Sequence, residues 1–437
     1  MRLSGKGSSR RDFLKASLPG IAVPVFLPSG LLFLAQGTPP SERVHLGMIG
    51  LGSMGLRHVM GFLEERDCQI VAVCDVDATR REAALKVIHE REGHGGCLGI
   101  HDYRELLDRK DVDAVCISVP DHWHGVMAIS AARAGKDIYG EKPLTRTIAE
   151  GRSVVEAIRR YGVIWETGSW QRSTHQFRFA CELVRNGRIG ELKLCQVGIG
   201  LGFRCETQPE MPVPPGFDYE RWLGPAPRAP YTEKRCHWNF RWILDYAGGQ
   251  VTDWGAHHVD IAQWGMDTDD TGPVEIQGEG IYPQEGLWDA AVEYRFECFY
   301  SKGLLLRVGS NNIYPQGVRF EGKDGWIHVT RSGLSAEPQK ILRSRLGPGD
   351  LRLPVPAGDD RQGHRRDFLD CVKQRGKPIA PVEVGHRSAT VCHLGNIAMQ
   401  LGRPLRWDPE KEIFPDDEVA NRFLSSPMRE PYGDEIS

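Results

Sequence analysis

One short stretch near the beginning of the chain limits the fold more than any other, because it places three glycines between an apolar run and an amphipathic segment. The apolar run 44–49 is expected to be a buried strand, and residues 56–65 are expected to form the helix that follows it. Gly50, Gly52 and Gly55 lie between them and complete the pattern Gly-x-Gly-x-x-Gly. Such glycines permit a tight turn, close approach of the backbone to a pyrophosphate, and close packing of the helix on the strand. The pattern predicts a dinucleotide-binding unit of the Rossmann type.

A second apolar run, 68–74, ends at Asp75, about twenty residues beyond the last glycine, where this fold places its ribose-binding acid. Asp75 can accept hydrogen bonds from both ribose hydroxyls of NAD, whereas the 2′-phosphate of NADP would meet a like charge. NAD is therefore the expected cofactor. Arg80 and Arg81 keep NADP open as an alternative, although exposed charges on the next helix are the simpler explanation for them.

The alternation of strand and helix continues as far as residue 143. Apolar runs at 112–119 and 137–139 are expected to be strands of the same parallel sheet, with a helix at 125–134 between them. Because successive βα units bring their strand ends to one edge of such a sheet, the residues that follow each strand are expected to reach the cofactor. Beyond the three glycines and Asp75, the expected cofactor contacts are Ser53, Met54, Pro120, His124, Glu141 and Lys142.

Lys142 stands in Glu141-Lys142-Pro143, at the end of the last of these strands. Pro143 fixes its own φ and disfavours a helical conformation for the residue before it, so Lys142 is not expected on a solvated helix face. A lysine fixed at this point could reach both cofactor and substrate. His122 and His124 could together bind a metal, but no third ligand is recognisable nearby. Contact with the cofactor or a helix cap is therefore favoured for them, and no metal is expected.

Two stretches of the second half carry candidate substrate contacts. An expected strand over 163–173 ends in polar and aromatic residues: Trp170, Gln171 and Arg172. These side chains could line a sugar site or simply cap the strand. The segment 201–246 is rich in proline and carries interleaved aromatic and polar residues, Trp238 among them. So long an irregular segment favours a lid or binding loop, with an interface between subunits as the alternative.

The run 248–264 holds acidic and imidazole side chains at helical spacing. If it is helical from about Thr252, then Asp253, His257, Asp260 and Trp264 lie along one stripe. Carboxylates and an imidazole on one face are costly in a core and common in an active site. His257 is expected to titrate in the range useful for proton transfer. Asp253 could instead be a helix N-cap.

At this point the chain resembles a known family. A Rossmann unit that ends in Glu-Lys-Pro and is followed by an Asp-x-x-x-His segment is similar to the Gfo/Idh/MocA family of sugar and polyol oxidoreductases, over nearly all of the chain after its first forty residues. The resemblance implies a C-terminal domain whose open sheet often forms the subunit interface, and hence a homo-oligomer. It also implies that Lys142 is the catalytic lysine and that Asp253 and His257 are its partners.

Strands between residues 274 and 331 carry turn signals and predict an antiparallel sheet, which helices at 363–375 and 386–401 would complete. The expected fold is therefore α/β, with an N-terminal Rossmann dinucleotide-binding domain and a C-terminal α/β domain with an open, mainly antiparallel sheet. The expected divisions are an export signal and linker at 1–40, the Rossmann domain at 41–165, the substrate-binding and oligomerisation domain at 166–408, and a polar, extended tail at 409–437.

The first forty residues differ from the rest in composition. Arg10 and Arg11 precede an apolar run, 16–35, that three prolines and two glycines interrupt. Consecutive arginines before a broken apolar segment are typical of a twin-arginine export signal, while the prolines and glycines make a poor membrane-spanning helix. The expected location is the periplasm, with the membrane met only during export. Eleven scattered cysteines without a Cys-x-x-Cys pair fit a chain that folds before export.

A formal net charge of −3 provides no basic surface for nucleic acid, so a small carbohydrate is the expected partner. The expected reaction is hydride transfer from a sugar ring carbinol to NAD. Lys142 would be the acid–base or polarising group, His257 the proton relay and Asp253 the group that orients them. Because no free NAD is expected outside the cytoplasm, the cofactor would be tightly bound. Two alternatives stay open: an NAD-dependent glycosidase working through a transient keto-sugar, and a sugar or NAD sensor without catalysis.

Overall fold

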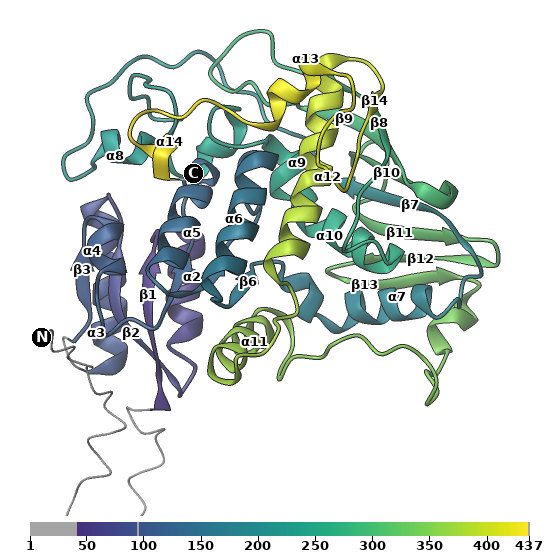
Figure 1. Ribbon diagram of the computed structural model, residues 1–437, viewed down its shortest axis with the longest axis horizontal. Helices are drawn as coiled ribbons and strands as arrows, with labels where there is room; N and C mark the ends of the chain where they lie inside the picture. Colours follow the sequence, from purple (N-terminus) through teal and green to yellow (C-terminus); the bar gives the residue numbers. More distant parts are fainter. Residues whose placement is uncertain (1–41, 94–95, 436–437) are drawn as a thin grey trace, which may run out of the picture. The chain divides into compact units, whose positions relative to one another are not determined.

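The computed structural model describes residues 42–93 and 96–435. The predicted export signal at 1–40 lies outside these residues. Among the described helices, none combines the length and the apolar character needed to span a membrane. Two sheets organise the described chain, a parallel one in its first part and a mixed one in its second part (Figure 1).

The first sheet has six parallel strands in the order β3-β2-β1-β4-β5-β6. The strands are β1 (Val44–Ile49), β2 (Cys68–Cys74), β3 (Leu98–Ile100), β4 (Ala114–Ile117), β5 (Asp137–Gly140) and β6 (Trp165–Thr167). The helices between them are α2 (Ser53–Phe62), α3 (Ala78–Glu92), α4 (Tyr103–Leu107), α5 (His124–Arg133) and α6 (Ile148–Tyr161). One face of the sheet packs against α2 and α3, and the other against α5 and α6. Burial on both faces explains why the central strands β1, β2 and β4 are mainly apolar runs, and the predicted Rossmann domain is confirmed.

The second sheet has eight strands in the order β13-β12-β11-β7-β10-β9-β8-β14, and only β7 and β10 pair in parallel. The strands are β7 (Leu192–Ile199), β8 (Glu275–Ile281), β9 (Glu293–Phe299), β10 (Leu305–Ser310), β11 (Gly317–Gly322), β12 (Gly325–Thr330), β13 (Gly333–Glu337) and β14 (Leu405–Arg406). The expected mainly antiparallel sheet is thus confirmed. On β9, Tyr294 and Phe296 face the core, whereas Arg295 and Glu297 are more exposed on the opposite face. Association of copies through that face stays a prediction.

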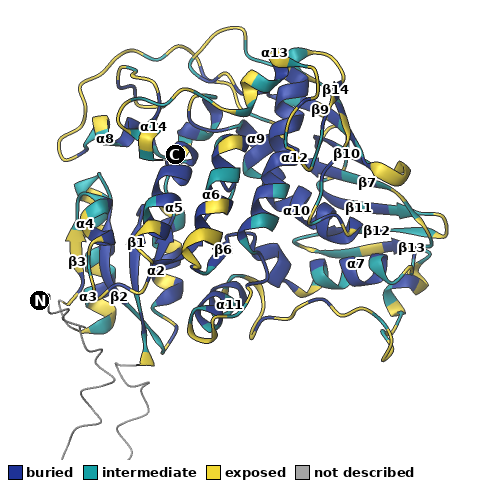
Figure 2. Cartoon of the chain, in the orientation of Figure 1, coloured by how far each residue is buried: buried dark blue, intermediate teal, exposed yellow. Residues whose placement is uncertain are grey.

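Two helices of the second domain are buried over most of their length, α10 (Gly255–Met266) and α12 (Val382–Leu401), and both are largely dark blue in Figure 2. They pack against each other and against the second sheet, together with α7 (His175–Arg185). α12 also contacts α6 of the Rossmann domain. This helix therefore belongs to both packing layers, and it contributes to a polar link between them.

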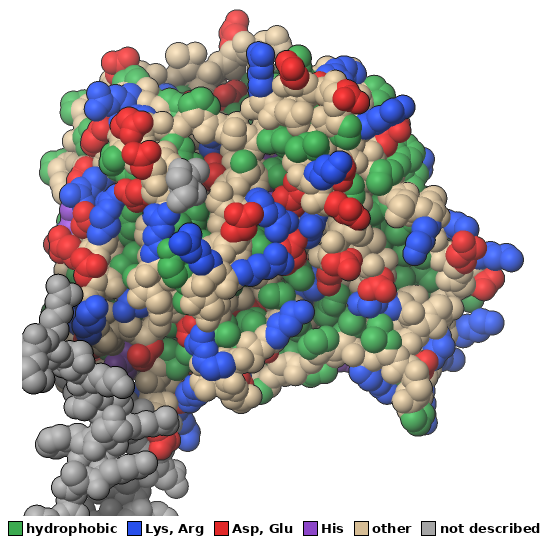
Figure 3. All heavy atoms as spheres, viewed as in Figure 1, with side chains coloured by type: hydrophobic (Ala, Val, Ile, Leu, Met, Phe, Trp, Pro, Cys, Tyr) green, Lys and Arg blue, Asp and Glu red, His purple; other side chains and the backbone are tan. Residues whose placement is uncertain are grey.

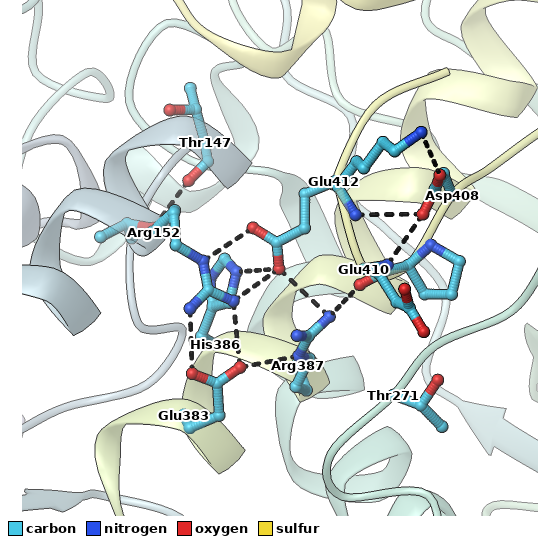
Figure 4. Close-up of polar contacts among 12 residues, drawn as sticks. Thr147, Arg152, Thr271, Glu383, His386, Arg387, Asp408, Glu410 and Glu412 are labelled. Atoms are coloured by element: carbon cyan, nitrogen blue, oxygen red, sulfur yellow. Dashed lines mark hydrogen bonds and ion pairs between the residues drawn. The ribbon is translucent and has the colours of Figure 1, made fainter. Parts of the chain in front are cut away.

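Arg152 on α6 is the centre of that link, a cluster of charged residues shown in Figure 4. Its guanidinium group donates to both carboxylate oxygens of Glu383 at 3.0 Å and to both oxygens of Glu412 at 2.7 and 2.9 Å. His386 Nε2 lies 2.7 Å from Glu412, and Arg387 Nε donates to Glu383 at 2.8 Å. Burial alone would raise the pKa of the two glutamates, but these hydrogen bonds and positive charges hold both pKa values at about 2.

We expect this cluster to make the fold sensitive to acid. Carboxyl groups with folded pKa values of about 2, below their ordinary 4.5, contribute stability that is present above pH 4.5 and is lost as the pH falls toward 2. Arg152→Met should therefore lower the free energy of unfolding at pH 7 by about 2 kcal/mol and flatten its decline in acid. Urea unfolding at several pH values measures both effects.

Arg159 provides a matched control for this prediction. It lies on the same helix and donates to Glu383 at 2.8 Å, but its side chain is 62% exposed. An exposed ion pair contributes little, so Arg159→Met should change the urea midpoint only slightly. Equal effects of the Arg152 and Arg159 substitutions would contradict the role assigned to the cluster.

The C-terminal residues differ from the expected extended tail at 409–437. They include two short α-helices, α13 (Glu418–Asn421) and α14 (Tyr432–Glu435), and a 3-10 helix, η7 (Arg422–Leu424). The ring of Tyr432 lies 5.2 Å from that of Trp123, and Arg104 Nη2 donates to Glu435 at 2.6 Å. These partners stand in the Rossmann domain, far away in the sequence. The local polarity of the segment therefore carried no sign that it folds back onto the first domain.

All eleven cysteines are free thiols; ten of them are buried, and Cys68 is half-buried. Burial raises the pKa of every one of these thiols. Thiols of this kind are poor nucleophiles and behave as small hydrophobic side chains. The cysteines are therefore packing residues in this fold.

Candidate active site

A cavity of about 830 Å³ lies where the strand ends of the parallel sheet meet the second domain. From the Rossmann domain it is lined by Gly50, Gly52, Ser53, Met54, Asp75, Pro120, Glu141 and Lys142, among others. From the second domain it is lined by Trp170, Trp238, Arg241, Asp253, Trp254, His257, Arg331 and Arg361. The cavity therefore joins most of the predicted cofactor contacts and all three predicted catalytic residues in one space.

The glycine turn has the shape that a dinucleotide requires. Gly50 has a φ of +84°, and a Cβ on Gly55 would lie 1.9 Å from the Gly50 carbonyl oxygen, so neither position accepts a side chain. A Cβ on Gly52 would lie 2.8 Å from Arg80 Nη1, at the cavity wall. The N-terminus of α2 follows at Ser53, which lines the cavity together with Met54, and the N-terminus of a helix is a favourable place for a pyrophosphate. Gly55 itself does not line the cavity, in keeping with its expected packing role.

Asp75 stands at the end of β2, as predicted, and is held rigidly. Its Oδ2 accepts a hydrogen bond from the Leu51 backbone N–H at 2.7 Å, and its Oδ1 accepts one from Asp77 at 2.9 Å. A carboxylate oxygen has two lone pairs, so each can still accept a ribose hydroxyl. Of the two nearby arginines, Arg80 lines the cavity, whereas Arg81 donates to the Asp75 carbonyl and does not line it. The residues present fit NAD.

Lys142 bridges the two domains through an ion pair. Its Nζ donates to Asp253 Oδ1 at 2.6 Å and to the Asp253 carbonyl at 3.1 Å. Arg241 Nε approaches the same Oδ1 at 3.4 Å. Burial would raise the pKa of Asp253, but the two cations hold it below its ordinary value. The predicted pairing of Lys142 with Asp253 is present, and the carboxylate fixes the lysine at the cavity wall.

His257 lies on α10 beside this ion pair. Burial first, and then the charges of Lys142 and Arg331, lower its pKa well below 6.5. Its Nδ1 is buried and has no hydrogen-bond partner among the described residues. The expectation that His257 titrates near neutral pH is therefore wrong: the ring is neutral there, and its unprotonated nitrogen can accept a hydrogen bond.

Asp260 does not share the site with Asp253 and His257. The predicted single helix is broken at Trp254, between α9 (Gly249–Asp253) and α10. Asp260 is fully buried, where it accepts hydrogen bonds from Arg172 Nε at 2.8 Å and from the Ser388 hydroxyl at 2.9 Å. The shared stripe therefore does not form.

Two of the three predicted contacts at 170–172 turn away from the cavity. The expected strand ends earlier, and these residues form a 3-10 helix, η3 (Trp170–Ser173), in which successive side chains point in different directions. Only Trp170 lines the cavity. Arg172 is buried and paired with Asp260 and Asp269, while Gln171 Nε2 donates to the His257 carbonyl at 3.1 Å. Arg172 is thus a structural residue, and Gln171 lies behind the site.

The predicted histidine at the cofactor edge is also structural. Both ring nitrogens of His124 contact backbone carbonyls, those of Pro143 at 2.7 Å and Val119 at 2.9 Å, and the residue does not line the cavity. His122 Nε2 lies 2.9 Å from the Trp222 carbonyl. Within residues 42–93 and 96–435 no group of three or more His, Cys, Asp or Glu side chains is placed to hold a metal ion.

Two family models match nearly all of the described chain. One, an oxidoreductase family C-terminal alpha/beta domain, matches residues 202–434, and the other, the NAD-binding Rossmann fold of the same family, matches residues 44–169. The chain belongs to the Gfo/Idh/MocA family. Its cofactor is therefore NAD, in agreement with the glycine turn and Asp75.

Among curated proteins, this family member is 32% identical over 206 residues to glycosyl hydrolase family 109 protein 2 of Shewanella sp. (strain ANA-3). That match covers 43% of this chain and 44% of the relative, so it spans less than half of the relative's length. The 1,5-anhydro-D-fructose reductase of Ensifer adhaerens is 24% identical over 343 residues, 78% of this chain and 91% of that protein.

Solved structures of similar fold include the WlbA dehydrogenase from Bordetella pertussis in complex with NADH and UDP-GlcNAcA. It has a TM-score of 0.62 and 16% identity, and the match covers 84% of this chain and 99% of that one. A levoglucosan dehydrogenase in complex with NADH has a TM-score of 0.61 and 17% identity, over 83% of this chain and 99% of that one. At these identities the likeness establishes the shared fold alone.

Several cavity residues were not among the predicted site residues, namely Asp121, Arg241, Trp254, Arg331 and Arg361. Asp121 directly follows Pro120 after a strand, and this position could have predicted that it reaches the cavity. Burial raises the pKa of Asp121 to about 6. Arg331 and Arg361 come from the end of β12 and from α11 (Asp360–Gln374). Only tertiary packing brings these two beside Trp170, so sequence spacing could not reveal them.

Proposed function

We propose that this protein oxidises a ring hydroxyl of a sugar or glycoside with NAD as hydride acceptor. The observation that carries the proposal is the position of Lys142, at the cofactor edge of the parallel sheet and 2.6 Å from Asp253 of the second domain. His257 and the glycine turn line the same cavity. The names of similar proteins, a 1,5-anhydro-D-fructose reductase and a levoglucosan dehydrogenase, support a carbohydrate substrate.

Bound NAD supplies the hydride acceptor, and the residues of the chain supply orientation and proton transfer. As the substrate carbon becomes a carbonyl, its hydroxyl loses a proton. The neutral ring of His257 can accept the hydrogen bond of that hydroxyl and relay the proton onward, because burial and the charges of Lys142 and Arg331 disfavour a lasting imidazolium. Lys142 can donate a hydrogen bond to the oxygen on which negative charge develops. Asp253 orients the lysine, and Arg241 holds Asp253 from a second side.

The proposal includes a cofactor that leaves its site slowly, and export through the signal at Arg10 and Arg11. Support for slow release comes from the C-terminal helix α14. Its residues Tyr432 and Glu435 line the cavity together with Arg104, near the end of β2 that carries Asp75. A dinucleotide bound at that end would have to leave past this helix. An enzyme that keeps its cofactor could be exported in the loaded state.

A second candidate is a redox-neutral glycosidase, and the similarity to glycosyl hydrolase family 109 proteins favours it. In such a reaction the chain would oxidise the sugar ring, release the aglycone by elimination, add water and return the hydride to the same sugar. His257 and Asp121, both in the cavity, are available for the additional proton transfers.

One experiment separates the two candidates. Purified protein is incubated with aryl glycosides and with free sugars, while NADH absorbance and released aglycone are followed together. NADH accumulation supports the dehydrogenase, and aglycone release without NADH accumulation supports the glycosidase. A protein that binds NADH and sugars but gives neither product would contradict both and leave the sensor.

A further inference from the structure

Arg331 and Arg361 line the cavity near His257, and neither forms an ion pair with a carboxylate in the part of the chain that the structure describes. Arg331 Nε donates to Gln171 Oε1 at 2.9 Å, but its Nη2 is buried without a partner, as is Nε of Arg361. On the face shown in Figure 3, by contrast, basic and acidic side chains are interspersed. A buried N–H donor of a charged group costs free energy when it has no hydrogen-bond acceptor. Arg331 and Arg361 therefore favour a bound acceptor that the chain itself does not supply.

Aromatic rings hold both guanidinium groups in place next to His257. Arg331 lies 4.5 Å from the ring centroid of Trp170 and 4.2 Å from that of Trp254, and Arg361 lies 4.1 Å from that of Trp170. The same two tryptophan rings lie 6.0 and 6.3 Å from the ring of His257. A guanidinium group stacked on a ring keeps its N–H edge free for hydrogen bonds. The pair therefore belongs to the substrate end of the cavity.

The acids at this end form no ion pair with either arginine, although the charges of Asp360 and Asp253 act on Arg331 and partly offset the lowering of its pKa. Asp253 is shared by Lys142 and Arg241, and Glu141 accepts a hydrogen bond from His58 at 2.8 Å. Burial, followed by the neighbouring charge of Arg361, lowers the pKa of Arg331 to about 10. A guanidinium group destabilised in this way still carries its charge at neutral pH. The region therefore has an excess of positive charge that a substrate can compensate.

We propose that Arg331 and Arg361 bind the negatively charged group of an anionic sugar, and that a carboxylate, as in a uronic acid or its glycoside, is the group that fits. This inference rests on the proposed sugar oxidation and narrows its substrate class. A planar carboxylate accepts paired hydrogen bonds from a guanidinium fork. Sulfate and phosphate esters of sugars share this chemistry. Gln171 is a positioning residue, since it contacts both Arg331 and the backbone of His257.

The test measures binding to the NADH-loaded protein by calorimetry, with glucuronate, glucose, glucose 6-phosphate and glucose 6-sulfate as probes. We expect glucuronate to bind about tenfold to a hundredfold more tightly than glucose, as charge-assisted hydrogen bonds imply. In Arg331→Met and Arg361→Met this ratio of dissociation constants should fall toward one. Because misfolding weakens the binding of both sugars, the ratio reports on the anion site itself.

Arg319 supplies a matched control. Its guanidinium group also lies over a tryptophan, 4.0 Å from the ring of Trp326, but it does not line the cavity. Arg319→Met should leave the ratio unchanged. The protein could instead bind the phosphate or sulfate ester more tightly than glucuronate and lose this preference in Arg331→Met. That result would support the anion site and make the ester, rather than a carboxylate, its ligand. Equal binding of glucose and glucuronate would overturn the anion site alone, whereas an NADH-binding protein that bound no sugar would overturn the proposed sugar oxidation as well.

Discussion

Lys142→Met is expected to lower kcat by about 10²–10⁴-fold and to leave the affinity for NADH unchanged. The substitution removes the Nζ that lies 2.6 Å from Asp253 and faces the substrate end of the cavity. Asp253 keeps its contact with Arg241, so the buried carboxylate is not left without a cation. Steady-state rates with the best substrate and an NADH titration by fluorescence measure the two quantities separately.

Lys136 offers a control of the same kind in the same domain. Its Nζ donates to the carbonyl oxygens of Arg109 at 2.7 Å and Val112 at 2.8 Å, and it does not line the cavity. Lys136→Met should lower thermal stability while the turnover of the folded protein stays normal. Normal turnover of the Lys142 variant, or loss of its NADH binding, would remove Lys142 from its assigned role.

Arg172→Met is expected to lower the free energy of unfolding by about 3–5 kcal/mol, the largest effect on stability that we predict. The guanidinium group is enclosed, with 2% of its side chain exposed, and it holds Asp260 at 2.8 Å and Asp269 at 2.7 Å. Removing it leaves the carboxylate of Asp260, which is fully buried, without a cation. Chemical denaturation at pH 7 measures the change.

An exposed ion pair serves as the comparison. Arg403 contacts Asp417 at 2.7 Å with 44% of its side chain exposed, and Arg403→Met should change stability by less than about 1 kcal/mol. If Arg172→Met kept its stability and lost only sugar affinity, Arg172 would belong to the substrate site after all, against the burial seen in the structure. The same experiment therefore decides between the sequence-based expectation and the structural one.

The fold was largely predictable because its first half repeats one local pattern. The strands β1, β2 and β4 of the parallel sheet are apolar runs, and the glycine turn allows few alternatives, so the positions of Gly50, Asp75 and Lys142 followed from their order in the chain. A strand end in a parallel sheet fixes where the next residue points, which is why Pro120 and Glu141 also reach the cavity.

The second half was harder because its site depends on contacts between distant segments. The stripe from Asp253 to Asp260 failed at the helix break at Trp254, directly before Gly255, and Gln171 and Arg172 turned away when an expected strand became a 3-10 helix. Periodicity locates a side chain on an element but not the packing partner that captures it. The ion pair of Arg172 with Asp260 and the packing of α14 on the Rossmann domain are both contacts that periodicity could not predict.

The buried thiols have a practical and a biological consequence. A maleimide reagent should leave the native protein almost unlabelled and modify all eleven cysteines after unfolding, so the labelled mass reports on the folding of each variant without reference to activity. In oxidising surroundings, exposure of these thiols by unfolding would be damaging. An unfolded chain would present an odd number of thiols with no native disulfide to form, and random cross-links would then compete with refolding.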